Sequence, residues 1–197
     1  MMNRLIVICL IVLLTASTAL ASVTDTVRSA VNDVITIVSS PDMKKKNNEQ
    51  RRRSAIKKAI ANVFDSEEMA RRAMGKHWNQ RTPQERKQFV DLFATLLENS
   101  YAGKIESYNN ERIVYTREQV DETYAEVKSK VITPKHDEYT LDYRLIQKGN
   151  RWVVYDVIIE GVSLVSNYRT QFNKIISSSG YPELVRKLQT KSNELKL

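Results

Sequence analysis

Residues 152–172 read WVVYDVIIEGVSLVSNYRTQF, and this stretch contains a change from strand to helix. Its first part belongs to a strand predicted over 151–160 and is apolar on both faces, which is typical of a strand that is covered on both sides or that lies centrally under a bulky element. Gly161 ends the sheet, and from Val162 to Ile176 apolar residues return at helical spacing. The stretch therefore predicts a sheet whose last strand leads directly into a helix.

Three more strands are predicted upstream, at 111–118, 122–133 and 138–147. In the second and third of these, apolar and polar residues alternate, as in a strand with one buried face. Gly149 and Asn150 are typical of a tight hairpin between the last two strands of the chain. Because all the links are short, we predict a four-stranded antiparallel meander.

Helical patterns precede the strands. An apolar stripe from Val27 to Val38 predicts a helix that ends before Pro41, and residues 44–63 form a second, strongly basic helical pattern. A short helix is predicted from Ser66 to Met74, with Gly75 as its C-terminal cap.

Two pairs of residues mark helix starts. Asp65 with Glu68, and Thr82 with Glu85, have the spacing of a capping box. Pro83 at the first helical position strengthens the second signal, which opens a long helix with an apolar face.

A final helix is predicted after the sheet segment. Gly180 caps the helix that begins near Val162, and Pro182 starts a last helix that ends near Leu195. The order of helices, strands and helices predicts one α+β domain, in which helices pack on the antiparallel sheet.

The N-terminus is typical of a cleavable signal peptide over residues 1–21. Arg4 precedes an apolar run from Leu5 to Leu14, and Ala19-Leu20-Ala21 is a small-x-small cleavage site. The run is too short to cross a bilayer, which needs about 20 apolar residues. We therefore expect export, a mature domain over 22–197, and loss of Cys9, the only cysteine.

The net charge of the chain limits the classes of molecule that it is expected to bind. The formal net charge is +8, and it becomes +7 once Arg4 is removed. A basic exported protein can meet anionic lipid headgroups, nucleic acid or acidic proteins, and export makes nucleic acid the weakest of these.

Side chains suited to catalysis are few. His77 beside Trp78 is typical of a packing or hydrogen-bonding residue, and His136 is predicted in a surface turn. Asp156 and Glu160 share a strand face about 13 Å apart, too far for glycosidase chemistry, so we expect them to pair with Arg144, Arg169 or backbone donors. Ser163 lacks the second glycine of a nucleophile elbow. The sequence thus predicts neither an enzyme nor a metal site.

Basic residues concentrate in the second helical pattern and the segment before it. They form either an ordinary solvated helix face or a docking surface for an acidic partner or an anionic membrane. The residues of this basic cluster are Lys44, Lys45, Lys46, Arg51, Arg52, Arg53, Lys57 and Lys58.

Three ordered blocks carry a resemblance to a known family. Residues 70–78 match A-R-R-x-x-G-x-H-W, residues 82–101 match a central helix that begins Thr-Pro, and 152–172 match W-x-VYDV-x-x-EGVSLV-x-NYR-x-QF. The chain resembles, over about 25–190, the MlaC/toluene-tolerance family of periplasmic phospholipid-binding proteins. Residues 41–53 and 109–122 match no strong family pattern.

The resemblance implies a fold and a function. It implies an NTF2-like α+β fold, in which an apolar cavity between sheet and helices holds acyl chains. It further implies a monomeric periplasmic carrier with phospholipid as cargo and no cofactor. Such a carrier moves lipid, in lipid-asymmetry maintenance, between an outer-membrane lipoprotein complex and an inner-membrane MCE-protein/ABC transporter complex. A hopanoid-type lipid remains an alternative cargo.

Cavity residues are predicted from the inward positions of strands and facing helices. They are Phe93, Leu97, Val127, Val131, Leu141, Tyr143, Val153, Tyr155, Val157, Ile159, Leu164, Val165 and Tyr168. Arg169 is predicted as a cation that either contacts the headgroup or pairs within the protein. Two other functions stay open on the residues alone: a periplasmic enzyme on an NTF2-like scaffold, and a protein-binding adaptor without a ligand.

Overall fold

The computed structural model describes residues 22–194. The predicted signal peptide and Leu195, the predicted end of the last helix, lie outside these residues. Among residues 22–194, no helix combines the length and the apolarity needed to cross a membrane.

A run of helices comes first in the chain, the strands of one sheet follow, and a helix comes last, as predicted. The helical elements are α1 (Val23–Ser39), the 3-10 turn η1 (Lys46–Asn48), α2 (Glu49–Ala61), α3 (Ser66–Met74), the 3-10 turn η2 (Gly75–Gln80), α4 (Pro83–Glu106) and α5 (Leu164–Glu194). The strands are β1 (Arg112–Asp121), β2 (Tyr124–Ile132), β3 (Glu138–Lys148), β4 (Arg151–Ile159) and β5 (Val162–Ser163).

The sheet is antiparallel with the order β1-β2-β3-β4-β5, so it has five strands where four were predicted. Val162 and Ser163, predicted as helical, pair with Ile159 and Ile158 before the helix begins. Two residues are too short a run to show the period-2 pattern of a strand, which is why the sequence did not reveal β5. The α+β class is confirmed.

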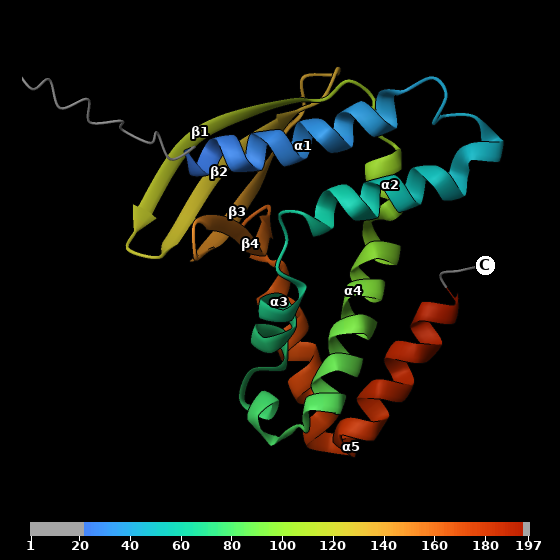
Figure 1. Cartoon of the computed structure of the whole chain (residues 1–197), viewed down its shortest axis with the longest axis vertical. Helices are drawn as coiled ribbons and strands as arrows, with labels where there is room; N and C mark the ends of the chain where they lie inside the picture. Colours follow the sequence, from blue (N-terminus) through green and yellow to red (C-terminus); the bar gives the residue numbers. More distant parts are fainter. Residues whose placement is uncertain (1–21, 195–197) are drawn as a thin grey trace, which may run out of the picture.

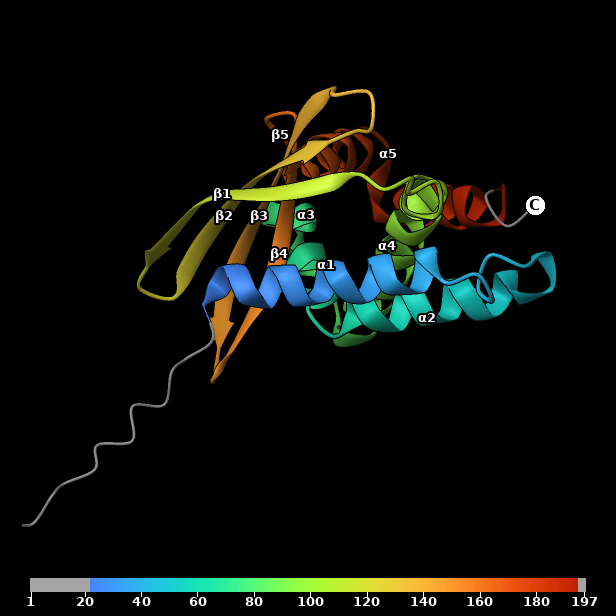
Figure 2. The same cartoon turned by 90° about the horizontal axis from the view of Figure 1, so that it is seen from above.

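Figure 1 shows two regions. The sheet and α1 lie together, while α3, α4 and α5 form a helical group below them and α2 runs alongside α1. Seen from above, α1 extends along one side of the sheet while α5 lies on another (Figure 2). After α3, the chain passes from the helical group to the sheet where α4 leads into β1, and it returns to the helical group where β4 and β5 lead into α5.

Local capping explains where the helices begin and end. Ser22 caps α1, and Thr82 and Glu85 form the predicted reciprocal capping box at α4. Gly75 ends α3 with φ of 56°, as its predicted cap role requires. Gly180 interrupts α5 with φ of 82°, so that Pro182 opens a second helical segment.

The predicted capping box of α3 is only half formed. The Asp65 side chain accepts a hydrogen bond from the Glu68 N–H at 2.9 Å. The Asp65 N–H, however, donates to the Val154 carbonyl at 2.9 Å, because the segment before α3 pairs with β4 around Phe64. The Glu68 carboxylate is therefore left for other partners.

Candidate functional site

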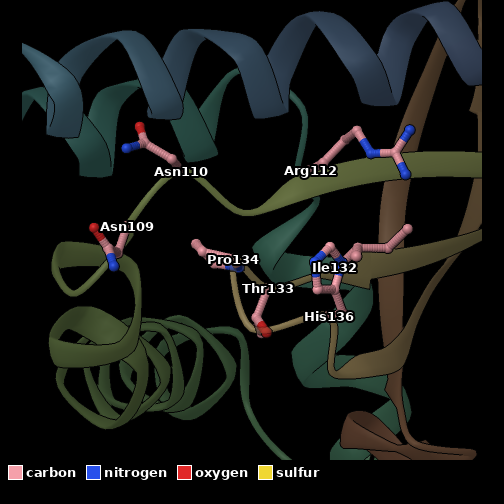
Figure 3. A pocket seen from close by; sticks show the side chains of 7 residues that line it. All are labelled: Asn109, Asn110, Arg112, Ile132, Thr133, Pro134 and His136. Atoms are coloured by element: carbon pink, nitrogen blue, oxygen red, sulfur yellow. The ribbon is translucent and has the colours of Figure 1, made fainter.

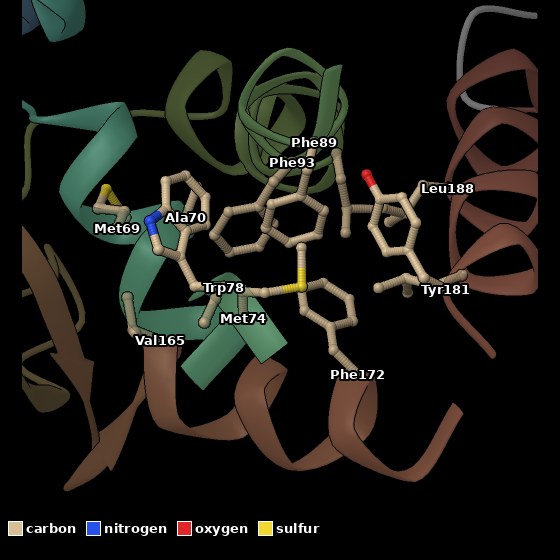
Figure 4. Close-up of a cluster of buried hydrophobic side chains, with 13 residues drawn as sticks. Met69, Ala70, Met74, Trp78, Phe89, Phe93, Val165, Phe172, Tyr181 and Leu188 are labelled. Atoms are coloured by element: carbon tan, nitrogen blue, oxygen red, sulfur yellow. The ribbon is translucent and has the colours of Figure 1, made fainter. Parts of the chain in front are cut away.

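Two apolar cores fill the molecule. The helical core lies among α3, η2, α4 and α5, where Phe89, Phe93 and Phe172 contact one another at ring-centroid distances of 5.4–5.8 Å (Figure 4). The sheet core lies between α1 and the sheet, where Val23 and Val27 pack with residues of β2, β3 and β4. Most of the buried apolar side chains thus belong to one of two clusters.

Phe64 is the half-buried side chain that packs against both cores. It immediately precedes Asp65, the N-cap of α3, and the core residue Met69 lies five positions further on. This is the spacing of a hydrophobic staple, a signal that would have singled out Phe64 from the sequence. The side chain marks the place where helical core and sheet core meet.

The predicted cavity residues divide between the two cores. Phe93 and Val165 belong to the helical core, and Leu97, Leu164 and Tyr168 are half-buried against it. Val127, Tyr143 and Val157 belong to the sheet core, and Leu141 and Ile159 are half-buried against it.

Three predicted cavity residues belong to neither core. Val131 is buried, while Val153 and Tyr155 are half-buried. The assignment of all thirteen residues to lipid contact stays a prediction.

A β-bulge in β4 explains the position of Tyr155. Arg144 of β3 is in register with Asp156, whereas its neighbour Leu145 is in register with Val154, which leaves Tyr155 as an extra residue. Val154 and Val157 consequently both belong to the sheet core although they are three residues apart. Of the four inward positions predicted on β4, Val157 and Ile159 therefore pack with the sheet core, while Val153 and Tyr155 do not.

Tyr155 instead faces the helical group. The Arg72 guanidinium of α3 lies 3.8 Å from the centroid of the Tyr155 ring, and Tyr124 makes an edge contact with that ring at 6.2 Å. Burial raises the pKa of Tyr155, and the Arg72 charge opposes this effect. The phenol therefore stays neutral and acts as a cation–π partner.

Arg72 is held by a buried carboxylate. The Glu68 side chain accepts hydrogen bonds from Arg71 Nε at 2.9 Å and from Arg72 Nε at 2.6 Å. Burial alone would raise the pKa of Glu68, but these arginine hydrogen bonds outweigh it and lower the pKa. This contact gives a structural role to both arginines of the A-R-R segment.

Asp156 fixes the start of α5. Its carboxylate accepts a hydrogen bond from the Val165 N–H at 3.0 Å and from the Ser163 hydroxyl at 2.6 Å, and Arg144 lies 3.6 Å away. Glu160 accepts a hydrogen bond from the Thr140 N–H. Of the predicted partners, Arg144, Arg169 and backbone donors, the structure pairs Asp156 with Arg144 and a backbone N–H, and Glu160 with a backbone N–H.

His77 and Arg169, which belong to the motifs that resemble the family, hold α5 against η2 and the end of α3. His77 Nε2 lies 3.0 Å from Asn173 Oδ1, as expected for a packing histidine. The Arg169 stem packs over Gly75, where a Cβ would lie 3.2 Å from Arg169 Cδ. Arg169 Nη2 also contacts Ser166 Oγ at 3.4 Å. Arg169 thus has a structural contact, and its headgroup role stays a prediction.

The basic cluster is partly neutralised within the protein. Arg52 is largely buried, with its side chain 15% exposed, and it pairs with Glu106 of α4 at 3.1 Å. Arg53 also approaches Glu106, and Lys57 pairs with Glu98 at 2.8 Å.

Two other members of the basic cluster pair with an exposed acid. Lys45 lies 3.0 Å and Arg51 3.2 Å from Asp42, so the charges of these residues are also offset at the surface. Lys44, Lys46 and Lys58 are exposed and make no ion pair within the described part of the chain.

A polar hollow of about 390 Å³ lies where the helical group meets the sheet (Figure 3). It is bounded by the connection from α4 to β1 and by the end of β2 with its turn into β3. The lining residues are Asn109, Asn110, Arg112, Ile132, Thr133, Pro134 and His136. None of the predicted cavity residues lines it, and sequence reasoning missed it because the lining comes from two segments without a motif.

His136 is exposed in the turn after β2, as predicted, and has φ of 70°. Within residues 22–194, no group of three His, Cys, Asp or Glu side chains is arranged to hold a metal ion.

Comparison with known proteins identifies the family. A family model described as MlaC protein matches residues 28–190. The chain belongs to the MlaC family. The match includes all three blocks that suggested the resemblance, which is thereby confirmed.

Relatives of this MlaC-family chain have informative names. The intermembrane phospholipid transport system binding protein MlaC of Haemophilus influenzae is 21% identical over 172 residues, which are 85% of this chain and 80% of that protein. The toluene tolerance protein ttg2D of Pseudomonas putida is 26% identical over 128 residues, or 64% of this chain and 60% of that protein.

A solved relative shares the fold closely. The phospholipid-binding protein from Ralstonia solanacearum, determined in complex with a phospholipid, is 32% identical with a TM-score of 0.82. The superposition covers 90% of this chain and all of that protein. The fold built by this sequence is therefore one that holds a phospholipid in a relative.

Proposed function

We propose that this chain is a carrier that takes up a phospholipid and moves it between two membranes. The phospholipid-bound relative from Ralstonia solanacearum, which shares the fold over its whole length, is the observation that carries the proposal. The Haemophilus influenzae relative, whose name describes intermembrane phospholipid transport, supports the same function.

Acyl chains fit best between the helical core and the sheet core. Leu97 and Leu164 at the edge of the helical core, and Leu141 and Ile159 at the edge of the sheet core, are half-buried apolar side chains. Leu141 and Ile159 lie opposite each other on β3 and β4. An acyl chain contributes about 0.8 kcal/mol for each CH₂ that it buries, so apolar surface is the main requirement of a carrier.

The carrier works without catalysis and without a cofactor. Asp156 is the most deeply buried carboxylate among the described residues. It accepts hydrogen bonds from the Val165 N–H at the start of α5 and from the Ser163 hydroxyl. These contacts favour a carrier over an enzyme on the same scaffold.

The proposed location is the periplasm. A signal peptide over residues 1–21 would export the chain, and its cleavage would leave a monomer without cysteine. The proposed donor and acceptor are an outer-membrane lipoprotein complex and an inner-membrane MCE-protein/ABC transporter complex.

We further propose that the exposed part of the basic cluster guides docking to acidic partners. Lys44, Lys46 and Lys58 have no partner within the described residues, so their charges remain available. Exchange of these three lysines for Gln should slow lipid transfer between the complexes and reduce its salt dependence. Equal transfer rates for the exchanged and unchanged proteins would refute the docking surface.

Native mass spectrometry of the purified mature protein, followed by lipid extraction, tests the carrier function. A mass increment that matches one or more phospholipids is expected. Leu97→Trp and Leu141→Trp, which enlarge half-buried side chains at the edges of the two cores, should lower the lipid-bound fraction. Val120→Trp, at a position 51% exposed on β1, is the matched control. A folded, lipid-free protein that also takes up no added phospholipid would exclude the function.

A further inference from the structure

We propose that the polar hollow between the α4–β1 connection and the β2–β3 turn binds the phosphodiester of the phospholipid headgroup, with Arg112 as its cation. This inference rests on the proposed carrier function and adds a headgroup site to it.

The position of the hollow favours the headgroup. α4 supplies Phe93 and Leu96 to the helical core, and β2 supplies Ala125 and Val127 to the sheet core. The hollow lies at the place where α4 has ended and the sheet begins (Figure 3). A lipid whose acyl chains lie between the two cores can therefore place its polar end there.

The charge of the lining favours an anion. Arg112 makes no ion pair within residues 22–194, so its guanidinium keeps all of its side-chain donors for a ligand. The fork of an arginine matches two oxygens of a phosphate group. Asn109 and Asn110 add amide donors, and His136 adds a ring nitrogen.

Nearby acids are already engaged. Glu111 accepts a hydrogen bond from the Asn109 N–H at 2.6 Å. The Thr133 hydroxyl lies 3.5 Å from the Asp137 carboxylate, and it accepts a hydrogen bond from the Asp137 N–H. These contacts hold the two loops, and they leave Arg112 as the unpaired charge of the lining.

Backbone conformation fixes the two loops. Asn110 has φ of 61° and His136 has φ of 70°, both in the left-handed region that residues with a Cβ seldom adopt. Two of the four such non-glycine residues in the described chain thus line this one hollow. Such conformations often accompany binding sites, because the surrounding structure must hold them in place.

The test compares two lipids that differ only in the headgroup. Delipidated mature protein is loaded with palmitoyl-oleoyl phosphatidylglycerol or with palmitoyl-oleoyl glycerol, and the dissociation constants are measured. Wild-type protein should prefer the phospholipid, and Arg112→Ala should weaken its binding about tenfold without affecting the diacylglycerol.

Arg117→Ala is the matched control. Arg117 is exposed on the same strand, makes no ion pair within the described residues and does not line the hollow. An equal loss in the Arg112 and Arg117 variants would mean a general charge effect and would overturn the site.

Two further outcomes separate the sources of the phosphate. Inorganic phosphate added without lipid should compete only at millimolar concentration. Submillimolar competition that depends on Arg112 would identify a site for free phosphate and overturn the headgroup assignment. If Arg112→Ala leaves phospholipid binding unchanged, the headgroup site is wrong while the carrier function stands. Failure of the wild type to bind either lipid would instead contradict the carrier function.

Discussion

Replacement of Asp156 by Ala should weaken the attachment of α5 to the sheet. It should lower the unfolding free energy more than any substitution of an exposed residue. The carboxylate is buried, at 3% exposure, and it accepts hydrogen bonds from the Val165 N–H and the Ser163 hydroxyl. Ser163 is the N-cap of α5, and Asp156 accepts a second N–H of the first turn. Loss of an acceptor for a first-turn N–H costs about 1–2 kcal/mol, and loss of a hydrogen bond to a charged group costs about 1.5–3 kcal/mol. Arg144 is 42% exposed and regains water, so its pairing with Asp156 adds little. We expect a loss of about 3 kcal/mol of unfolding free energy.

Urea denaturation measures this loss. With an m-value of about 2 kcal/mol/M, the midpoint should fall by about 1.5 M. Asp156→Asn keeps an acceptor for the Val165 N–H and should lose only about half as much. Asp121→Ala is the control, because Asp121 is exposed at the end of β1 and its carboxylate makes no hydrogen bond or ion pair within residues 22–194. A loss below about 0.5 kcal/mol in Asp156→Ala would refute the role of Asp156 in holding the first turn of α5.

Three further substitutions test other contacts. Gly75→Ala should cost about 1–2 kcal/mol of unfolding free energy, measured by thermal denaturation, because the residue has φ of 56° and its Cβ would crowd Arg169. Glu68 has a lowered pKa in the folded state, so the stability that it provides is present above its ordinary pKa of 4.5 and is lost as the pH falls through the lower folded value. Glu68→Gln should therefore flatten the fall in melting temperature over that acidic range. Arg52→Gln should cost about 1–3 kcal/mol in urea denaturation, because it breaks the half-buried pair with Glu106.

Each of these substitutions has a contrary outcome. An unchanged melting temperature for Gly75→Ala would mean that the backbone relaxes at the end of α3. A pH profile of Glu68→Gln that parallels the wild type would mean that its carboxylate does not titrate with folding. Arg51→Gln is the control for Arg52, because Arg51 is 66% exposed, and equal effects of the two would contradict the buried role of Arg52.

Local signals predicted the elements well because their causes lie within a few residues. The α3 boundaries at Ser66 and Met74 and the capping box at Thr82 are those expected from the sequence. The four long strands appear within about three residues of their predicted limits, since each has enough residues to show its period.

Contacts between distant segments could not be predicted in the same way. The partners that neutralise Arg52 and Lys57 are Glu106 and Glu98, which lie on another helix. The lining of the polar hollow comes from two loops whose proximity depends on the β1–β2 register. A pattern along the chain carries no information on such pairs, so it shows neither which residues of the basic cluster are paired nor that Arg112 lines a hollow.

The bulge at Tyr155 has a consequence for how this chain tolerates change. A regular strand presents alternate residues to one side, so a uniform β4 would direct all of one residue set toward α1. The extra residue divides β4 into two half-strands of opposite parity, with Val154 and Val157 on one side and Tyr155 turned toward Arg72 on the other. Deletion of Tyr155 would restore alternation and keep Val154, Asp156 and Val157 opposite Leu145, Arg144 and Tyr143, so its cost should be the lost contact between Arg72 and the Tyr155 ring. Deletion of Val157, from the regular part of the strand, would instead bring Asp156 or Ile158 to the side of the sheet core and should be the more damaging of the two deletions.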